Sequence, residues 1–133
     1  MLSAFGFIDM NKAISKKTVV IGASENPARY AFRAVHRLKN SGHEVVPIGL
    51  KPGSIGDIRI LTNFPSIKDV HTVSLYIRPS VQKHYEDYII NLKPKRIIFN
   101  PGTENPELVR KAKANGIAAE IGCTLVMLSI ADY

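Results

Sequence analysis

The chain has 133 residues, of which 45% are hydrophobic and 22% charged, and its formal net charge is +7. This length allows one domain with a single core, and no apolar run approaches the roughly 20 residues that a membrane-spanning helix needs. We expect one globular domain, residues 18–133, after an N-terminal extension, residues 1–17, that lacks the basic leader and apolar stretch of a secretory signal.

Five apolar segments rich in β-branched residues alternate along the chain with helical patterns, which indicates a parallel sheet built from βαβ units. Turn-forming residues dominate 49–57, and a short helical turn is expected at 63–69. The pattern predicts an α/β fold: a doubly wound, mostly parallel five-stranded sheet with helices on both faces. The expected strands are 18–22, 43–48, 72–77, 96–99 and 117–121, and the expected helices are 27–41, 80–92, 106–115 and a terminal helix after Cys123.

The first strand leads directly into a predicted anion site. The chain breaks at Gly22, with Ala23 and Ser24 in the turn, and restarts as a helix with Asn26 as the expected N-cap and Pro27 at its first position. Free backbone N–H groups and the positive end of the helix dipole converge at such a junction. Arg29 either meets a bound anion there or points into solvent.

The type of phosphate ligand is narrowed by two departures from the dinucleotide fingerprint. Only the first glycine of G-x-G-x-x-G is present, at Gly22. The acid that binds a ribose 2′-hydroxyl after the second strand is missing, and Lys51 occupies this region instead. A lysine cannot accept a hydrogen bond from a hydroxyl, but it suits a phosphate on a ribose, as in NADP or coenzyme A (CoA).

The chain resembles the stand-alone CoA-binding domain proteins, the YccU-like group, which are similar to the nucleotide-binding domain of the succinyl-CoA synthetase alpha subunit. The resemblance spans about residues 18–128 and rests on the stretches 20–29, 42–51, 76–79 and 101–123. It implies a Rossmann-like domain with a CoA pocket. The family commonly has Asn-Pro before the lysine, where this chain has Gly49-Leu50.

The resemblance also implies roles for individual residues. Gly22, Ala23 and Ser24 would line the pyrophosphate turn, and Arg29 and Lys51 would meet phosphates. Ile77, Arg78 and Pro79 would border the path of the adenosine or the pantetheine. The full predicted set of cofactor-binding residues is Gly22, Ala23, Ser24, Asn26, Arg29, Lys51, Ile77, Arg78, Pro79 and Gly102.

No pattern in the chain predicts catalysis or a metal site. The four histidines lack metal-ligand spacing, and the single cysteine cannot form an internal disulfide, so we expect a reducing compartment, the cytoplasm. Cys123 is either a thiol that exchanges with CoA or a small apolar side chain in the interior. The phosphorylated histidine of the synthetases belongs to a second domain, for which this chain has no room.

Three functions follow, in order of preference. The first is non-catalytic binding of CoA or an acyl-CoA, a small-molecule nucleotide ligand. The second is an NADP(H)-binding oxidoreductase fragment, although no residues for a nicotinamide or substrate site are evident. The third is nucleic-acid binding driven by the positive charge, which is least favoured because the basic residues are spread along the chain.

Overall fold

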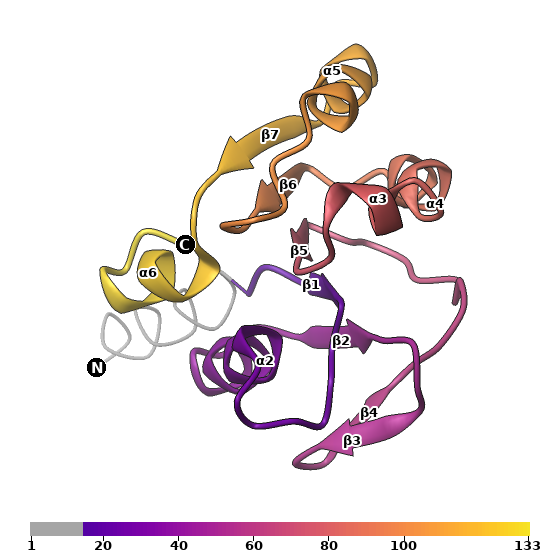
Figure 1. The fold of residues 1–133 in the computed structure, drawn as a ribbon. Coiled ribbons are helices and arrows are strands. Elements are labelled where there is room, and N and C mark those ends of the chain that lie inside the picture. The colour runs from indigo at the N-terminus through magenta and orange to yellow at the C-terminus, as the bar shows by residue number, and fades with distance from the viewer. Residues whose placement is uncertain (1–14) are drawn as a thin grey trace.

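The computed structural model describes residues 15–133 (Figure 1). The predicted extension therefore lies outside the described residues except for 15–17, and its boundary stays a prediction. The strands are β1 (Thr18–Ile21), β2 (Val45–Ile48), β3 (Gly53–Ile55), β4 (Ile58–Ile60), β5 (Thr72–Leu75), β6 (Arg96–Phe99) and β7 (Ala118–Ile121). The helices are α2 (Tyr30–Asn40), α3 (Pro79–Gln82), α4 (Glu86–Asn91), α5 (Pro106–Ala114) and α6 (Thr124–Ser129).

The main sheet confirms the predicted doubly wound fold. Its five strands run in the order β2-β1-β5-β6-β7, and all neighbouring pairs are parallel. After β2, the chain crosses over β1 to reach β5, so the direction of winding reverses between β1 and β5. This reversal creates the topological switch point at which ligands bind in open α/β sheets.

Two hydrophobic clusters cover the two faces of the sheet. Successive residues of a strand point to opposite faces, so Val19 and Ile21 join one cluster and Val20 joins the other. α4 and α5 pack on the first face, and α2 and α6 pack on the second (Figure 1). Within residues 15–133, no helix has both the length and the apolar character required to cross a bilayer.

The expected helix 80–92 is wrong as a single element. α3 ends at Gln82 and α4 begins at Glu86, and between them the backbone bonds run over three residues, from Tyr85 N–H to the Gln82 carbonyl at 2.8 Å. This tighter turn allows Gln82, Tyr85 and Glu86 all to face the interior. The burial of these three side chains favours the tighter turn over the single continuous helix that the sequence pattern predicted.

The expected helical turn at 63–69 is also wrong, because no helix forms there. Asn63 and Asp69 have left-handed backbone conformations, with φ of 62° and 58°. Phe64 lies 5.3 Å from the rings of both Tyr85 and Tyr88, and the Tyr88 hydroxyl donates to the Pro65 carbonyl. These contacts with α4 hold the segment in an irregular path along the surface.

Candidate functional site

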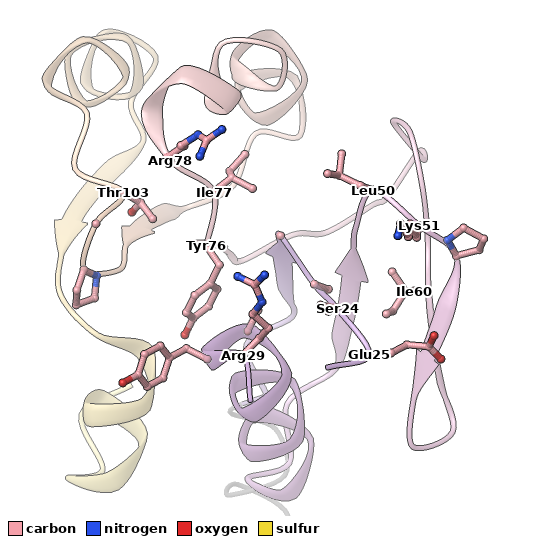
Figure 2. Close-up of a pocket in the computed structure, with 17 residues that line it drawn as sticks. Ser24, Glu25, Arg29, Leu50, Lys51, Ile60, Tyr76, Ile77, Arg78 and Thr103 are labelled. Carbon is pink, nitrogen blue, oxygen red and sulfur yellow. The ribbon is translucent and has the colours of Figure 1, made fainter. Parts of the chain in front are cut away.

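A cleft of about 710 Å³ lies beside the carboxyl ends of β1 and β5, at the switch point (Figure 2). Its floor is the turn after β1 and the start of α2. One wall is the loop from β2 into the hairpin β3–β4, and the other comes from the segments that follow β5 and β6. The fold thus brings together loops that are distant in sequence, as expected for this sheet topology.

The turn after β1 is fixed to both neighbouring strands. Gly22 has a φ of 103°, and a Cβ on it would meet the backbone of Tyr76 at 3.0 Å. The N–H groups of Gly22 and Ala23 both donate to the Ile48 carbonyl at 2.9 Å. We expected the N–H groups of this turn to be free for an anion. This expectation is wrong at Gly22 and Ala23, because the Ile48 carbonyl of β2 already accepts from both.

The helix after this turn begins later than the sequence suggested. The Asn26 side chain accepts from the Ala28 N–H at 3.0 Å, and the Asn26 N–H donates to Ser24 Oγ at 3.1 Å. A side chain that accepts from the backbone two residues on closes a local turn, which competes with helix formation. The predicted N-cap role of Asn26 is therefore wrong, and Arg29 occupies the N-cap position of α2.

Within residues 15–133, the first backbone N–H groups of α2 are unpaired, unlike those of Gly22 and Ala23 in the turn after β1. No side chain of the described residues caps this helix, and no acidic residue lies in its first turn. The first N–H groups of an α-helix have no partner within the helix, and they carry the positive end of its dipole. Since Arg29, Tyr30 and Ala31 line the cleft, this helix end opens toward it. The helix N-terminus that the sequence placed at Pro27 therefore lies at Tyr30.

The hairpin β3–β4 builds the wall that carries Lys51. It turns at Gly56 and Asp57, and β4 continues into Leu61, which bonds to Pro47 and Gly49 of the β2 segment at 2.9 Å. From the sequence, turn-forming residues were expected over 49–57, and no hairpin was predicted. A Gly-Asp pair between two isoleucines is nevertheless a hairpin signal in the sequence, and it could have revealed this wall.

The opposite wall is held by buried amides. Gln82 Nε2 donates to the carbonyls of Ile77 and Thr103, both at 2.8 Å, and Gln82 Oε1 accepts from Asn105 Nδ2 at 2.9 Å. Asn100 Nδ2 donates to Ser74 Oγ at 2.9 Å. Because these buried groups are paired, they fix the loops after β5 and β6 relative to each other.

Most of the predicted binding residues come together in this cleft. All of the predicted residues line the cleft except two: Asn26 lies in the turn between β1 and α2, and Pro79 begins α3. Their role in holding a ligand stays a prediction. The lining residues outside the predicted set are Glu25, Tyr30, Ala31, Leu50, Pro52, Ile60, Tyr76, Pro101 and Thr103.

The cleft has a cationic character. Arg29 lies between Arg78 on one side and Lys51 on the other (Figure 2), and all three side chains belong to exposed residues. Glu25 is the only acidic residue among residues 15–133 that lines the cleft. Three cations and an open helix N-terminus attract an anion with more than one negative charge.

Tyr76 adds an uncharged surface beside these cations. Burial raises the pKa of its phenol above the ordinary value of 10, so the group is protonated at neutral pH. Its hydroxyl is buried and has no hydrogen-bond partner within residues 15–133. The tyrosine therefore contributes no negative charge that would repel a phosphate.

The histidines and the cysteine of the chain lie outside the cleft. All four histidines and the single cysteine fall within the described residues, and none of them lines the cleft. Cys123 is half-buried at the N-cap of α6. In the part of the chain that the structure describes, no group of three His, Cys, Asp or Glu residues could hold a metal ion.

Solved structures confirm the fold. A crystal structure titled only as that of an uncharacterized protein shares 50% identity, with a TM-score of 0.87 over 90% of this chain and 98% of that one. A Thermus thermophilus protein shares 18% identity, with a TM-score of 0.79 over 96% of this chain and 98% of that one. A hypothetical protein from Pyrococcus horikoshii shares 23% identity, with a TM-score of 0.78 over 94% and 89%.

A comparison with curated proteins gives no significant match. The sequence model of one family, described as "CoA binding domain", matches residues 16–129. Within residues 15–133, every strand of the sheet and every residue that lines the cleft falls in this stretch. The chain belongs to the CoA-binding domain family.

Proposed function

We propose that this protein binds coenzyme A or an acyl-CoA in the cleft at the switch point and does not itself catalyse a reaction. The observation that carries the proposal is the union of an uncapped helix N-terminus with Arg29, Lys51 and Arg78 in one cleft. CoA carries a diphosphate and a separate ribose phosphate, so it offers anionic groups to cations on different elements.

The arrangement of the cleft suggests a direction for the ligand. The diphosphate would meet the first turn of α2 and Arg29, where backbone N–H groups and charge act together. The ribose phosphate would lie toward Lys51 on the hairpin wall. The pantetheine would then extend toward Ile77 and Gly102, where the wall is fixed by the buried amides of Gln82 and Asn105.

The proposed absence of catalysis is supported by the composition of the cleft. Acyl transfer needs a nucleophile with a base, and hydride transfer needs a second site for the reacting substrate. The titratable side chains that line the cleft are Glu25, Arg29, Tyr30, Lys51, Tyr76 and Arg78. None of these forms a hydrogen-bonded pair of nucleophile and base with another.

The first prediction concerns Lys51 and is tested by calorimetric titration with CoA and with dephospho-CoA, which lacks the ribose phosphate. We expect CoA to bind about tenfold more tightly, since a charge-assisted contact contributes on the order of 1.5–3 kcal/mol and solvent weakens it. Lys51→Ala should bring the two affinities together. Lys68→Ala, an exposed lysine outside the cleft, is the matched control.

Binding of neither ligand by the unaltered protein would refute the proposal, and equal binding of both would refute the role of Lys51. The two alternatives have their own readouts. An NADP(H) site would enhance the fluorescence of NADPH on mixing, and a nucleic-acid surface would bind an oligonucleotide with a steep dependence on salt. Mass spectrometry of small molecules released from the purified protein would identify any acyl group.

A further inference from the structure

The loop that carries Lys51 is attached at its first residue to the turn after β1. The Gly49 N–H donates to the Leu61 carbonyl at 2.9 Å, which joins this residue to the end of β4. A Cβ on Gly49 would lie 2.4 Å from the Ala23 carbonyl oxygen. The backbone of the loop therefore packs directly on the backbone of the turn.

Glu25 attaches the other end of the same loop. Its carboxylate accepts from the Ser54 N–H at 3.0 Å, across 29 positions of sequence. A Cβ on Gly53 would lie 2.4 Å from the Glu25 carboxyl carbon, so the carboxylate rests on this glycine. Lys51 thus lies between two attachments, and both lead to the stretch 22–25 that forms the floor of the cleft.

An acidic side chain is out of place in a cleft for anions unless it serves another purpose. Glu25 forms no ion pair with any cation of residues 15–133, although Arg29 and Lys51 line the same cleft. Its negative charge lowers the attraction for a phosphate. A residue that breaks the local charge pattern points to a compensating role, and here its contacts are with the hairpin.

We propose that Glu25 is a positioning residue that holds the hairpin β3–β4 against the floor of the cleft and thereby sets the preference for a ligand with a ribose phosphate. The inference rests on the proposed function, because it concerns how Lys51 meets that phosphate. A flexible lysine on an unattached loop must be ordered when the ligand binds, whereas a loop fixed beforehand avoids this cost.

The test measures the dissociation constants of CoA and dephospho-CoA for four variants. Glu25→Ala removes the attachment and the charge. Glu25→Gln keeps an oxygen acceptor for Ser54 and removes only the charge. Gly53→Ala keeps the charge but displaces the carboxylate from Ser54. Glu44→Ala is the control, because Glu44 is an exposed acid that pairs with Lys17 at 3.5 Å outside the cleft.

We expect the preference for CoA over dephospho-CoA to fall about three- to tenfold in Glu25→Ala and in Gly53→Ala. It should be retained in Glu25→Gln, which should bind both ligands more tightly than the unaltered protein. Glu44→Ala should leave the preference unchanged. A purely electrostatic role for Glu25 would instead make Ala and Gln alike and leave Gly53→Ala without effect, and that result would overturn the inference.

The failure of the proposed function is distinguishable from the failure of this inference. If the unaltered protein binds neither ligand, the proposed function falls, and the inference falls with it. If it binds both ligands equally, the proposed function stands, and the roles of Lys51 and Glu25 in the preference are refuted. If the unaltered protein prefers CoA and Glu25→Ala keeps the full preference, only the role of Glu25 is refuted.

Discussion

Gly22 and Gly49 decide how closely the turn after β1 packs against its neighbours. At Gly22 both the left-handed backbone and the nearby Tyr76 backbone exclude a side chain. At Gly49 the obstacle is contact alone, because a Cβ would lie 2.4 Å from the Ala23 carbonyl oxygen. The floor of the cleft therefore depends on glycine at both positions, because a side chain as small as a methyl group would not fit at either.

The second prediction is that Gly49→Ala destabilises the protein by about 1–3 kcal/mol, because the backbone must move to relieve the clash. It should also weaken CoA binding, since the loop with Lys51 moves with it. Chemical denaturation and titration measure the two effects. Gly122→Ala is the control, because the atom nearest to its Cβ would be Met127 Sδ at 3.9 Å. Equal losses in the two variants would contradict the packing argument.

At the scale of elements, α5 shows how one cap serves both a helix and the site. Asn105 Oδ1 accepts from the Leu108 N–H at 3.2 Å and caps α5, and Pro106 is the first residue of the helix. Asn105 Nδ2 donates to Gln82, which in turn holds the Ile77 and Thr103 loops. The cap therefore links α5 to a wall of the cleft.

The third prediction is that Asn105→Ala lowers the free energy of unfolding by about 1–3 kcal/mol, because it removes a cap and leaves the buried Gln82 carbonyl unpaired. Denaturant titration measures this loss. Asn115→Ala is the matched control, since its amide bonds to the Lys111 carbonyl in an exposed position at the other end of α5. A similar loss in both variants would show that burial of Asn105 contributes nothing extra.

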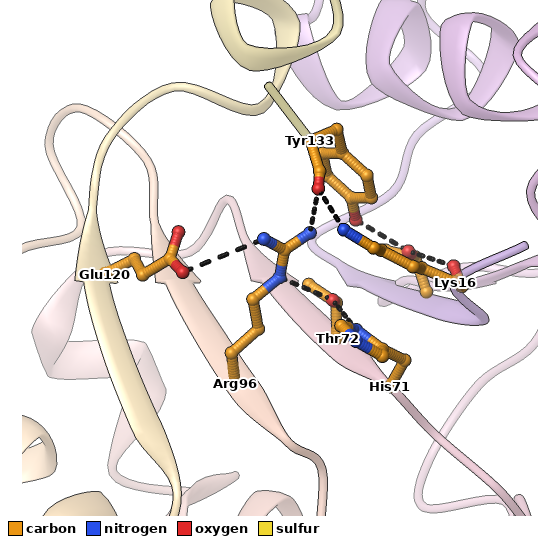
Figure 3. Close-up of polar contacts among 7 residues, drawn as sticks. Lys16, His71, Thr72, Arg96, Glu120 and Tyr133 are labelled. Atoms are coloured by element: carbon orange, nitrogen blue, oxygen red, sulfur yellow. Dashed lines mark hydrogen bonds and ion pairs between the residues drawn. The ribbon is translucent and has the colours of Figure 1, made fainter. Parts of the chain in front are cut away.

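At the scale of the whole molecule, the end of the sheet opposite the cleft holds a cluster around Arg96 (Figure 3). Arg96 Nε donates to Thr72 Oγ1 at 2.8 Å, and its guanidinium lies 4.4 Å from the centre of the Tyr133 ring. Two histidines form hydrogen bonds in this cluster. His43 Nδ1 accepts from the Lys16 backbone N–H at 2.9 Å, and His71 Nδ1 is bonded to Thr72 Oγ1 at 2.8 Å.

The pKa values of both histidines are below the ordinary value of 6.5. Burial is the main cause for each, followed by Lys16 and then Arg96 for His43, and by Arg96 and then Lys16 for His71. The folded state therefore binds fewer protons than the unfolded chain when the pH approaches 6.5 from above. The neutral histidines therefore contribute their full share to the free energy of unfolding above pH 6.5. This contribution is lost as the pH falls through and below this value.

The fourth prediction is a drop in stability between about pH 7.5 and pH 5.5 that is smaller in His43→Gln and in His71→Gln. Thermal unfolding at a series of pH values measures it. His84→Gln is the control, because His84 is exposed and lies outside this cluster. Stability that stays constant over this range, or a slope that only His84→Gln reduces, would contradict the assignment.

Patterns among neighbouring residues in the sequence were sufficient to predict much of the fold. The β-branched runs of β1, β5 and β6 are buried at every position, so they are recognisable without knowledge of their partners. The cap and proline of α5 are also local signals. The helical pattern at 80–92 failed because Gln82 is drawn into contacts with Thr103 and Asn105, residues more than 20 positions away.

The sequence by itself determined the alternation of strands and helices and the types of residue in the loops that follow them, because both depend on neighbours within a few positions. Only the tertiary structure decided where the helix N-terminus opens toward the cleft and which backbone N–H groups of the turn are already paired. Ile48 takes the N–H groups of Gly22 and Ala23, and Glu25 reaches Ser54. These contacts join segments more than 20 residues apart, and their partners are set by the order of the strands in the sheet.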